Sequence, residues 1–341
     1  MRTIIRPGDK VELRAAHRAA QVIRLLEATK ASIRLDQLRE SIGPDFFDHL
    51  LTEYMSARLA KSYKLWPDQW KDLVVIRDAP DMLRTYVEKV APLANLDRVE
   101  DSGGEFQKLP TPLDIEISYS CAGWGNLLVA DFETLRSDRL GWFKRVADEA
   151  GKAAARTFNR WLFQTMLQAN PIYAGDGHRL FDHEHHGNDP HEGSVTELTF
   201  DALKTAWNTM RSQRDDNGEP LVVTPGFLVV GPPNEVAAYK LIESEYVPGE
   251  ENASNFFRGR FRIIVTPYLG VDWYLWAKPE EIEGLEVGFL DGKVAPSIYM
   301  LNPDVSDTYF RTKKTMWRVE HYYGGAWIDY RGIVRGGGTG A

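Results

Sequence analysis

The chain is organised around the stretch RLGWFKRVADEAGKAAARTFNRWLFQTMLQAN, which runs from Arg139 to Asn170. Apolar residues recur in it every three or four positions, which places them on one face of a helix. No proline interrupts the run, and the consecutive alanines from Ala153 to Ala155 favour helix formation. We therefore predict one long helix on which other elements pack. The residues expected in its core are Trp142, Val146, Phe158, Trp161 and Leu162.

The composition is that of a globular protein. Of 341 residues, 43% are hydrophobic and 26% are charged, so disorder is not expected. No apolar run reaches about 18 residues and the start does not read as a secretion signal, so we expect neither a membrane span nor export. The single cysteine, Cys121, excludes intramolecular disulfides and fits a reducing compartment.

Charge is distributed unevenly along the chain. The formal net charge of −8 argues against a protein whose main task is to grip nucleic acid through its phosphates. Residues 1–30 nevertheless hold seven basic and three acidic side chains, a net of +4, which leaves −12 on the rest. This pattern predicts either a basic arm that reaches an acidic partner or a neighbouring copy, or a solvated amphipathic helix over residues 9–29.

A second pattern, from Leu113 to Cys121, alternates apolar and polar residues and predicts a strand with one buried face. The turn-rich stretch EDSGGEFQKLPTP precedes it, from Glu100 to Pro112, and Leu93–Val99 is a weaker strand candidate. Together these segments predict a long hairpin with an exposed polar tip. Such a hairpin has little core of its own and needs a partner to bury its apolar face.

The remaining periodicity mixes helices and strands. Helices are predicted from Pro44 to Leu59, from Phe200 to Arg214 and from Glu235 to Ser244. Strands are predicted at Gly226–Val230, Arg260–Thr266, Trp273–Ala277, Leu285–Leu290 and Ser297–Leu301. At the end of the chain, Thr315–Tyr322 and Ala326–Val334 are predicted to form a hairpin around a Gly324-Gly325 turn.

One cluster of residues invites an enzymatic interpretation. Five histidines fall within fourteen residues and have four acidic neighbours, and metal ligands are drawn from these side chains. They are His178, His183, His185, His186 and His191, with Asp176, Asp182, Glu184 and Asp189. The spacing is not that of the helical H-E-x-x-H motif, and nearby glycines and proline indicate a loop. We interpret the cluster as a hydrogen-bonded turn or surface group, and a metal site as the alternative.

Other catalytic motifs fail on spacing. Gly123-Trp124-Gly125 has Leu128 where a dinucleotide fingerprint needs its third glycine, and GFLDGKV from Gly288 has the wrong spacing for a phosphate loop. No G-x-S-x-G elbow is present, and Cys121 falls on the buried face of its strand. We therefore predict no catalytic residue, no metal ligand and no cofactor, and a protein that is not an enzyme.

The order of these segments resembles the major capsid proteins of tailed phages, and within them the Mu-like major head subunit group. The blocks that carry the resemblance run in sequence over roughly residues 45–335. They are LLVADFETLRSDRLGWFKRVADEAGKAAARTFNRWLFQTML, DGHRLFDHEHHGN, PGFLVVGPPNEVAAYKLIESEY, NFFRGRFRIIVTPYLGVDWYLWAKPE, LEVGFLDG and WRVEHYYGGAWIDYRGIVR. No block is a catalytic signature, and the specificity lies in their order and spacing.

The resemblance implies an α+β fold of the type named after phage Hong Kong 97. Residues 1–70 would form an N-terminal arm, 93–122 an extended hairpin loop, and 199–296 an axial domain. Residues 71–92 and 123–198 would form a peripheral domain with the spine helix 139–170, to which 297–341 return with the C-terminal tail. Contacts with other copies would come from the hairpin, through Leu96, Val99, Glu105, Phe106, Lys108, Leu113 and Ile115. The arm residues Arg2, Arg6, Arg14 and Arg18 would contact a neighbour or DNA.

The implied function is a major head protein that assembles in the host cytoplasm into pentamers and hexamers of a virion shell. Its partners would be itself, enclosed double-stranded DNA, and possible portal, decoration and separate scaffold proteins, without a membrane. Lys108 lies near the hairpin tip, but no partner is found for the Lys–Asn cross-link of some relatives. The alternatives are a nanocompartment shell of the same fold, a metal-dependent hydrolase using residues 178–191, and a soluble monomeric binding protein.

Overall fold

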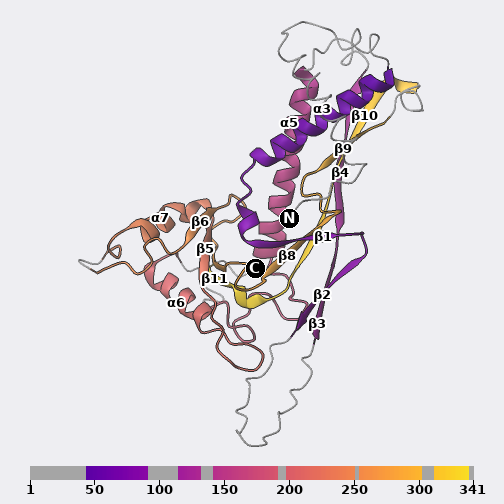
Figure 1. Ribbon diagram of the computed structural model, residues 1–341. Helices are drawn as coiled ribbons and strands as arrows, with labels where there is room; N and C mark the ends of the chain where they lie inside the picture. The colour runs from indigo at the N-terminus through magenta and orange to yellow at the C-terminus, as the bar shows by residue number, and fades with distance from the viewer. Residues whose placement is uncertain are drawn as a thin grey trace, which may run out of the picture. The chain divides into compact units, whose positions relative to one another are not determined.

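The computed structural model describes residues 44–90, 114–131, 141–190, 197–249, 253–301 and 311–337. They divide into two compact units, whose elements carry the labels of Figure 1. The first unit draws on Met1–Pro67, Gly123–Thr157 and Lys293–Tyr322, and the second on Asp68–Ala122, Phe158–Gly292 and Tyr323–Ala341. The predicted helix over residues 9–29 lies outside the described residues.

The described residues mix helices and strands, as the sequence predicted. The α-helices are α3 (Pro44–Leu65), α5 (Gly141–Arg160), α6 (Phe200–Arg211) and α7 (Glu235–Glu243). The strands are β1 (Val74–Ala79), β2 (Arg84–Val90), β3 (Asp114–Ser120), β4 (Ala122–Asp131), β5 (Pro225–Val230), β6 (Arg262–Val265), β7 (Trp273–Ala277), β8 (Leu285–Leu290), β9 (Ser297–Met300), β10 (Lys314–Trp327) and β11 (Ile333–Gly337). Short 3₁₀ turns cover Gln69–Asp72, Pro232–Asn234 and Tyr330–Gly332.

In the first unit, helices α3 and α5 approach each other closely. At Gly151 in α5, an added Cβ would stand 2.5 Å from the carbonyl oxygen of Leu59, so the approach requires a glycine. The guanidinium of Arg58 donates two hydrogen bonds to the carboxylate of Asp148, at 3.1 and 2.5 Å. This pair of parallel bonds fixes the register of the two helices.

The strands of the first unit complete its core. β9 pairs antiparallel with β10, through Trp317 opposite Met300 and Glu320 opposite Ser297. β4 is the other neighbour of β10. The largest fully buried side chains of this core are Met55, Leu59, Phe143 and Trp317.

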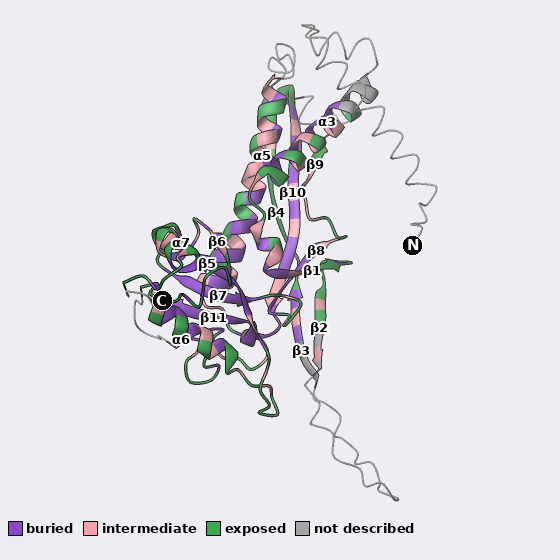
Figure 2. Ribbon diagram, turned by 60° about the vertical axis from the view of Figure 1, so that its left-hand side comes forward, coloured by how far each residue is buried: buried purple, intermediate pink, exposed green. Residues whose placement is uncertain are grey.

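The second unit contains two sheets and a separate hairpin. β8 pairs in parallel with β1 and antiparallel with the Tyr323–Trp327 part of β10. The other sheet has the order β11-β7-β5-β6, and Figure 2 shows β5, β7 and β11 as buried strands. Residues of α6 and α7 pack into the same hydrophobic core as this sheet, which includes the fully buried Met210, Leu228, Phe257 and Trp273. Because β11 joins this sheet, the end of the chain adds a strand to residues 225–277.

The predicted helix from Arg139 to Asn170 changes its hydrogen-bond pattern part-way. It is α-helical in α5 and π-helical over Trp161–Gln168, where the amide of Ala169 donates to the carbonyl of Gln164 at 2.8 Å. The indole N–H of Trp327 donates to the carbonyl of Met166 at 2.6 Å. A side chain from β10 therefore satisfies a carbonyl within the widened turn, as is common where a helix departs from α geometry.

The predicted turn at Gly324-Gly325 was wrong. β10 continues through both glycines, and Gly324 faces Gly288 of β8 in the antiparallel ladder. An added Cβ at Gly324 would stand 2.2 Å from the carbonyl oxygen of Ser120. The absence of a side chain at Gly324 therefore allows the backbone at Ser120 to approach closely, which is a common reason for glycine within a strand.

The partner of the alternating strand also differs from the prediction. β3 pairs with β2, in a register that runs from Arg84 opposite Ser120 to Val90 opposite Asp114. The candidate Leu93–Val99 lies outside the described residues. By contrast, the predictions of β7 and β8 match the observed bounds, and those of α6, α7 and β5 differ only at their ends.

We predict that Gly324→Ala destabilises the protein by about 3 kcal/mol, because the new methyl group overlaps the Ser120 carbonyl and backbone cannot move aside cheaply. Gly270→Ala is the matched control, since an added Cβ there meets nothing within 4 Å. Its effect should stay within about 0.5 kcal/mol. Denaturant unfolding of both variants measures the difference, and equal stabilities would contradict the close-approach argument.

Candidate assembly elements and the histidine-rich turn

Most residues predicted to contact other copies lie outside the described residues. This holds for the arm residues Arg2, Arg6, Arg14 and Arg18 and for the hairpin residues Leu96, Val99, Glu105, Phe106, Lys108 and Leu113. Ile115 belongs to β3, where its backbone pairs with Lys89. The structure therefore describes where the predicted hairpin begins and ends: β2 stops at Val90, β3 starts at Asp114, and these two residues are paired.

The base of this hairpin is held by buried polar contacts within the second unit. The hydroxyl of Tyr119 donates to one carboxylate oxygen of the fully buried Glu286 at 2.8 Å, and the guanidinium of Arg77 donates to the other at 2.5 Å. On β2, the ammonium of Lys89 contacts the carboxylate of Asp329 at 2.5 Å. Burial, together with the bond to Glu286, raises the pKa of Tyr119 and keeps it a donor. Both strands are thus tied to the unit by charge-assisted bonds.

The predicted core residues of the long helix are buried to different degrees. Phe158 and Leu162 are buried, whereas Trp142, Val146 and Trp161 are half-buried. The ring centroid of Phe158 lies 4.5 Å from that of Trp70 and 4.9 Å from that of Tyr323. The pair with Tyr323 is edge-to-face. These spacings are those of favourable aromatic pairs, so Phe158 is the main anchor of the helix in the second unit.

The described part of the histidine cluster lies in a compact loop from Asn170 to Asp189, called here the histidine-rich turn, and His191 lies outside the described residues. The side chain of Asn170 exchanges two hydrogen bonds with the backbone of Phe181, at 2.9 and 2.7 Å. The fully buried Asn188 donates to the carbonyl of Leu180 at 2.9 Å. Sequence reasoning missed these two asparagines, although asparagine beside glycine and proline is a usual signal of a turn built on side chains.

Within the turn, His186 is a structural residue. Its ring is buried and stacks on Tyr330 at 3.8 Å between centroids. Its Nδ1 lies 3.0 Å from the carbonyl oxygen of Leu180, and its Nε2 lies 2.6 Å from the carboxylate of Asp176. Contact with His186 is among the causes that keep the pKa of Asp176 below its usual value, against the opposing effect of burial. The hydrogen-bonded turn that the sequence predicted is therefore present.

Three other side chains of the cluster converge at the surface. Ligand atoms of His178, Asp182 and His185 all lie within 4.8 Å of one another. The rings of His178 and His185 stack at 3.6 Å between centroids, with an angle of 17° between their planes. Outside this group, the ring of His183 has its Nδ1 3.1 Å from the carbonyl oxygen of Asp189.

Cys121 follows β3 and is buried, as predicted from the alternating pattern. Burial raises the pKa of its thiol, which lies 3.7 Å from the carbonyl oxygen of Gly288. A buried thiol with a raised pKa is a poor nucleophile. The residue therefore acts as a small core side chain.

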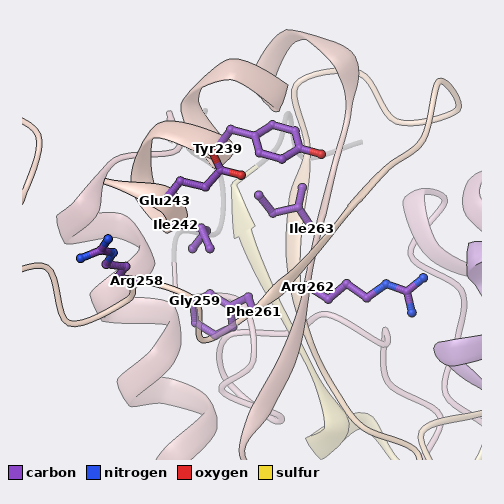
Figure 3. Close-up of a pocket in the computed structure, with 8 residues that line it drawn as sticks. All are labelled: Tyr239, Ile242, Glu243, Arg258, Gly259, Phe261, Arg262 and Ile263. Carbon is purple, nitrogen blue, oxygen red and sulfur yellow. The ribbon is translucent and has the colours of Figure 1, made fainter. Parts of the chain in front are cut away.

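An open groove lies between α7 and β6 in the second unit (Figure 3). Its lining residues are Tyr239, Ile242, Glu243, Arg258, Gly259, Phe261, Arg262 and Ile263. Figure 3 shows the guanidinium groups of Arg258 and Arg262 pointing to opposite sides, away from a common point. Catalytic sites need polar groups that converge on one reacting atom, and this groove does not supply them. Over the part of the chain that the structure describes, no helix is long and apolar enough to cross a membrane.

Comparison with known proteins identifies the family. The family model described as "Phage capsid protein" matches residues 119–336, which is well over half of the chain. The chain belongs to the phage capsid protein family. Membership places the chain among structural proteins of phage capsids. It leaves the interpretation as a hydrolase without support.

Individual relatives are more distant. The major capsid protein of Escherichia phage Mu is 35% identical over 74 residues, which cover 21% of this chain and 24% of the Mu protein. The match therefore spans about a quarter of the length of that relative, and gives weak support to the Mu-like resemblance.

One solved structure is similar with a TM-score above 0.5, and others are similar at lower scores. A structure of Microbacterium phage Oxtober96 is similar, with a TM-score of 0.51 and 10% identity, over 78% of this chain and 90% of that chain. The bacteriophage JBD30 capsid is similar with a TM-score of 0.49 and 13% identity, and the match covers 60% of this chain and 91% of that chain. A crystal structure of a virus-like particle from Pyrococcus furiosus is similar with a TM-score of 0.46 and 14% identity, and the match covers 83% of this chain and 98% of that chain. The Oxtober96 likeness carries the fold, and the predicted α+β fold of the Hong Kong 97 type is confirmed.

We predict that Phe158→Ala destabilises this capsid-family chain by about 3–5 kcal/mol, because it empties a fully buried aromatic site. Arg156→Ala on the exposed side of the same helix is the control and should change stability by less than about 0.5 kcal/mol. Thermal or denaturant unfolding of both variants provides the test. A loss below about 1 kcal/mol for Phe158→Ala would show that the helix is not anchored there.

Proposed function

We propose that this chain is the major head protein of a tailed double-stranded DNA phage or prophage. It assembles in the host cytoplasm into pentamers and hexamers that close an icosahedral shell around the genome, and it catalyses no reaction. The observation that carries the proposal is the family match from residue 119 to residue 336. The net charge of −8 supports containment of DNA over tight binding to it.

Within this shell we assign connecting roles to two segments. Residues 93–122 form the extended loop that lies across an adjacent subunit, and residues 1–70 form the arm. The pairing of Val90 with Asp114 supports the first assignment, because the two described residues that flank this stretch lie side by side in one ladder. The buried contacts of Tyr119 and Lys89 support it further, since a segment that carries load between subunits needs a stiff base.

The other segments form the body of each subunit. Residues 71–92 and 123–198 make the peripheral domain with its spine helix, 199–296 the axial domain, and 297–341 the return. The sheet β11-β7-β5-β6 and helices α6 and α7 support a separate axial core. Because β11 pairs with β7, the proposed axial core also takes in residues 333–337 of the return. Contacts in a closed shell are heterologous, so protruding connectors enlarge each contact without enlarging the core.

Electron microscopy of the purified full chain tests the proposal directly. We expect closed icosahedral particles. Heterologous contacts between identical subunits build closed rings when the rotation from one subunit to the next brings the last subunit back to the first. Particles isolated from infected or induced cells should contain nuclease-protected double-stranded DNA. Particles that hold protein cargo and no DNA would favour a nanocompartment shell instead. A purified chain that stays monomeric under all assembly conditions would overturn the proposal.

Two variants separate the connectors from the body. Removal of Ser102–Leu109 should leave the unfolding temperature of the subunit unchanged and abolish or weaken particle formation, because this stretch is polar and turn-rich. Replacement of Arg2, Arg6, Arg14 and Arg18 by Gln should lower particle yield or DNA retention. A truncation that unfolds the subunit would contradict the division into body and connector, and normal particles with normal DNA content from the Gln variant would remove the arm from the proposal.

A further inference from the structure

The histidine-rich turn is a pre-organised scaffold for surface side chains. Its backbone is closed by bonds from the amide of Tyr173 to the carbonyl of His178 at 2.7 Å and from the amide of Leu180 to the carbonyl of Pro171 at 2.8 Å. Gly177 and Gly187 adopt positive φ angles of 84° and 61°, which other residues rarely take. The turn therefore needs little rearrangement to hold its exposed groups in place.

The turn is also attached firmly to the rest of the second unit. The hydroxyl of Tyr173 donates to the carbonyl of Ile328 at 2.8 Å, and the amide of Arg335 donates to the carbonyl of Asn188 at 2.9 Å. Tyr173 and Asn188 are both buried. A ligand bound at the surface of the turn would thus meet side chains whose supporting shell is already rigid.

Three of these side chains offer the donor set of a transition-metal site. His178, Asp182 and His185 bring two imidazoles and one carboxylate within 4.8 Å of one another. The Nδ1 of His185 lies 3.1 Å from each carboxylate oxygen of Asp182. This contact is a hydrogen bond, and two ligands held at about 2.0–2.1 Å on a tetrahedral zinc ion stand about 3.3 Å apart, so zinc would replace the bond with little change in the separation of the two groups.

The backbone orients these ligands from behind. The amide of His185 donates to Asp182 Oδ1 at 2.8 Å, and the amide of His178 donates to Asp176 Oδ1 at 2.9 Å. Asp176 in turn contacts the buried ring of His186. Such outer contacts fix ligand orientation and strengthen metal binding.

We propose that His178, Asp182 and His185 form a binding site for one divalent transition-metal ion, of which zinc is the best match. Nitrogen donors disfavour magnesium and calcium, which prefer oxygen ligands. Three protein ligands leave a fourth position, which faces solvent because His185 is exposed. The ion would link His178 to Asp182 and His185, which lie further along the same histidine-rich turn. This inference concerns each single chain and does not depend on shell assembly.

Zinc titration of the untagged full chain tests the proposal. After treatment with a chelator and dialysis, calorimetry at neutral pH should give one zinc ion bound per chain and no response to magnesium. His178→Ala and His185→Ala should each weaken zinc binding by about 100-fold or more, since loss of a ligand costs at least as much as loss of an outer contact. His183→Ala is the matched control, because this exposed histidine of the same turn lies outside the group and should bind zinc like the parent.

A second measurement guards against misfolded variants. Cobalt added to the unaltered chain should give the visible absorption of a tetrahedral nitrogen and oxygen site, and zinc should remove it. Absence of this absorption overturns the proposal, as does zinc binding that survives in the His178→Ala/His185→Ala double variant. Equal losses in His183→Ala and His185→Ala would show non-specific histidine binding and also overturn it. Because the stoichiometry is counted per chain, failure of the chain to form particles leaves the result interpretable.

Discussion

The second unit depends on a pair of glycines that face each other across two strands. Gly288 of β8 and Gly324 of β10 are partners in the ladder, and β3 packs against both. A Cβ at Gly288 would stand 2.6 Å from the hydroxyl of Tyr119, and one at Gly324 would stand 2.2 Å from the carbonyl of Ser120. Real Cβ atoms essentially never show such distances, so the backbone of β3 fits here because Gly324 has no side chain, and Gly288 leaves room for the Tyr119 ring.

The same contact brings a buried charge into play. Once β3 is seated on the glycines, Tyr119 reaches the carboxylate of Glu286, and Arg77 neutralises that carboxylate from β1. A buried carboxylate without these partners would cost several kcal/mol. The close approach of β3 to the two glycines lets Tyr119 bind Glu286, and this bond in turn helps to hold β3 in place. β3 is the strand next to the proposed connector. A connector with a loose base would transmit little of the binding energy gained at its tip to the subunit that carries it.

These features explain which parts of the fold could be predicted. The strands Trp273–Ala277 and Leu285–Leu290 are short, mostly apolar runs between turn residues, and the local pattern was sufficient to place them. Gly324-Gly325 has the local pattern of a turn, and only the backbone of Ser120, about two hundred residues earlier, makes it part of a strand. The change to π geometry at Trp161 likewise involves a distant partner, Trp327. Local patterns therefore failed where long-range contacts decide the conformation.

The histidine-rich turn shows the same division on a smaller scale. Residue types alone indicated possible metal ligands, but they could not say which histidines face inward. In the structure the ring of His186 is buried, stacks on Tyr330 and contacts the carboxylate of Asp176. His178 and His185 lie at the surface beside Asp182. His186 makes the buried contacts of the turn, whereas the imidazole rings of the outward group, His178 and His185, lie outside those contacts. Chemistry of the outward group is therefore compatible with the structural role that family membership implies, because the two use different atoms of one segment.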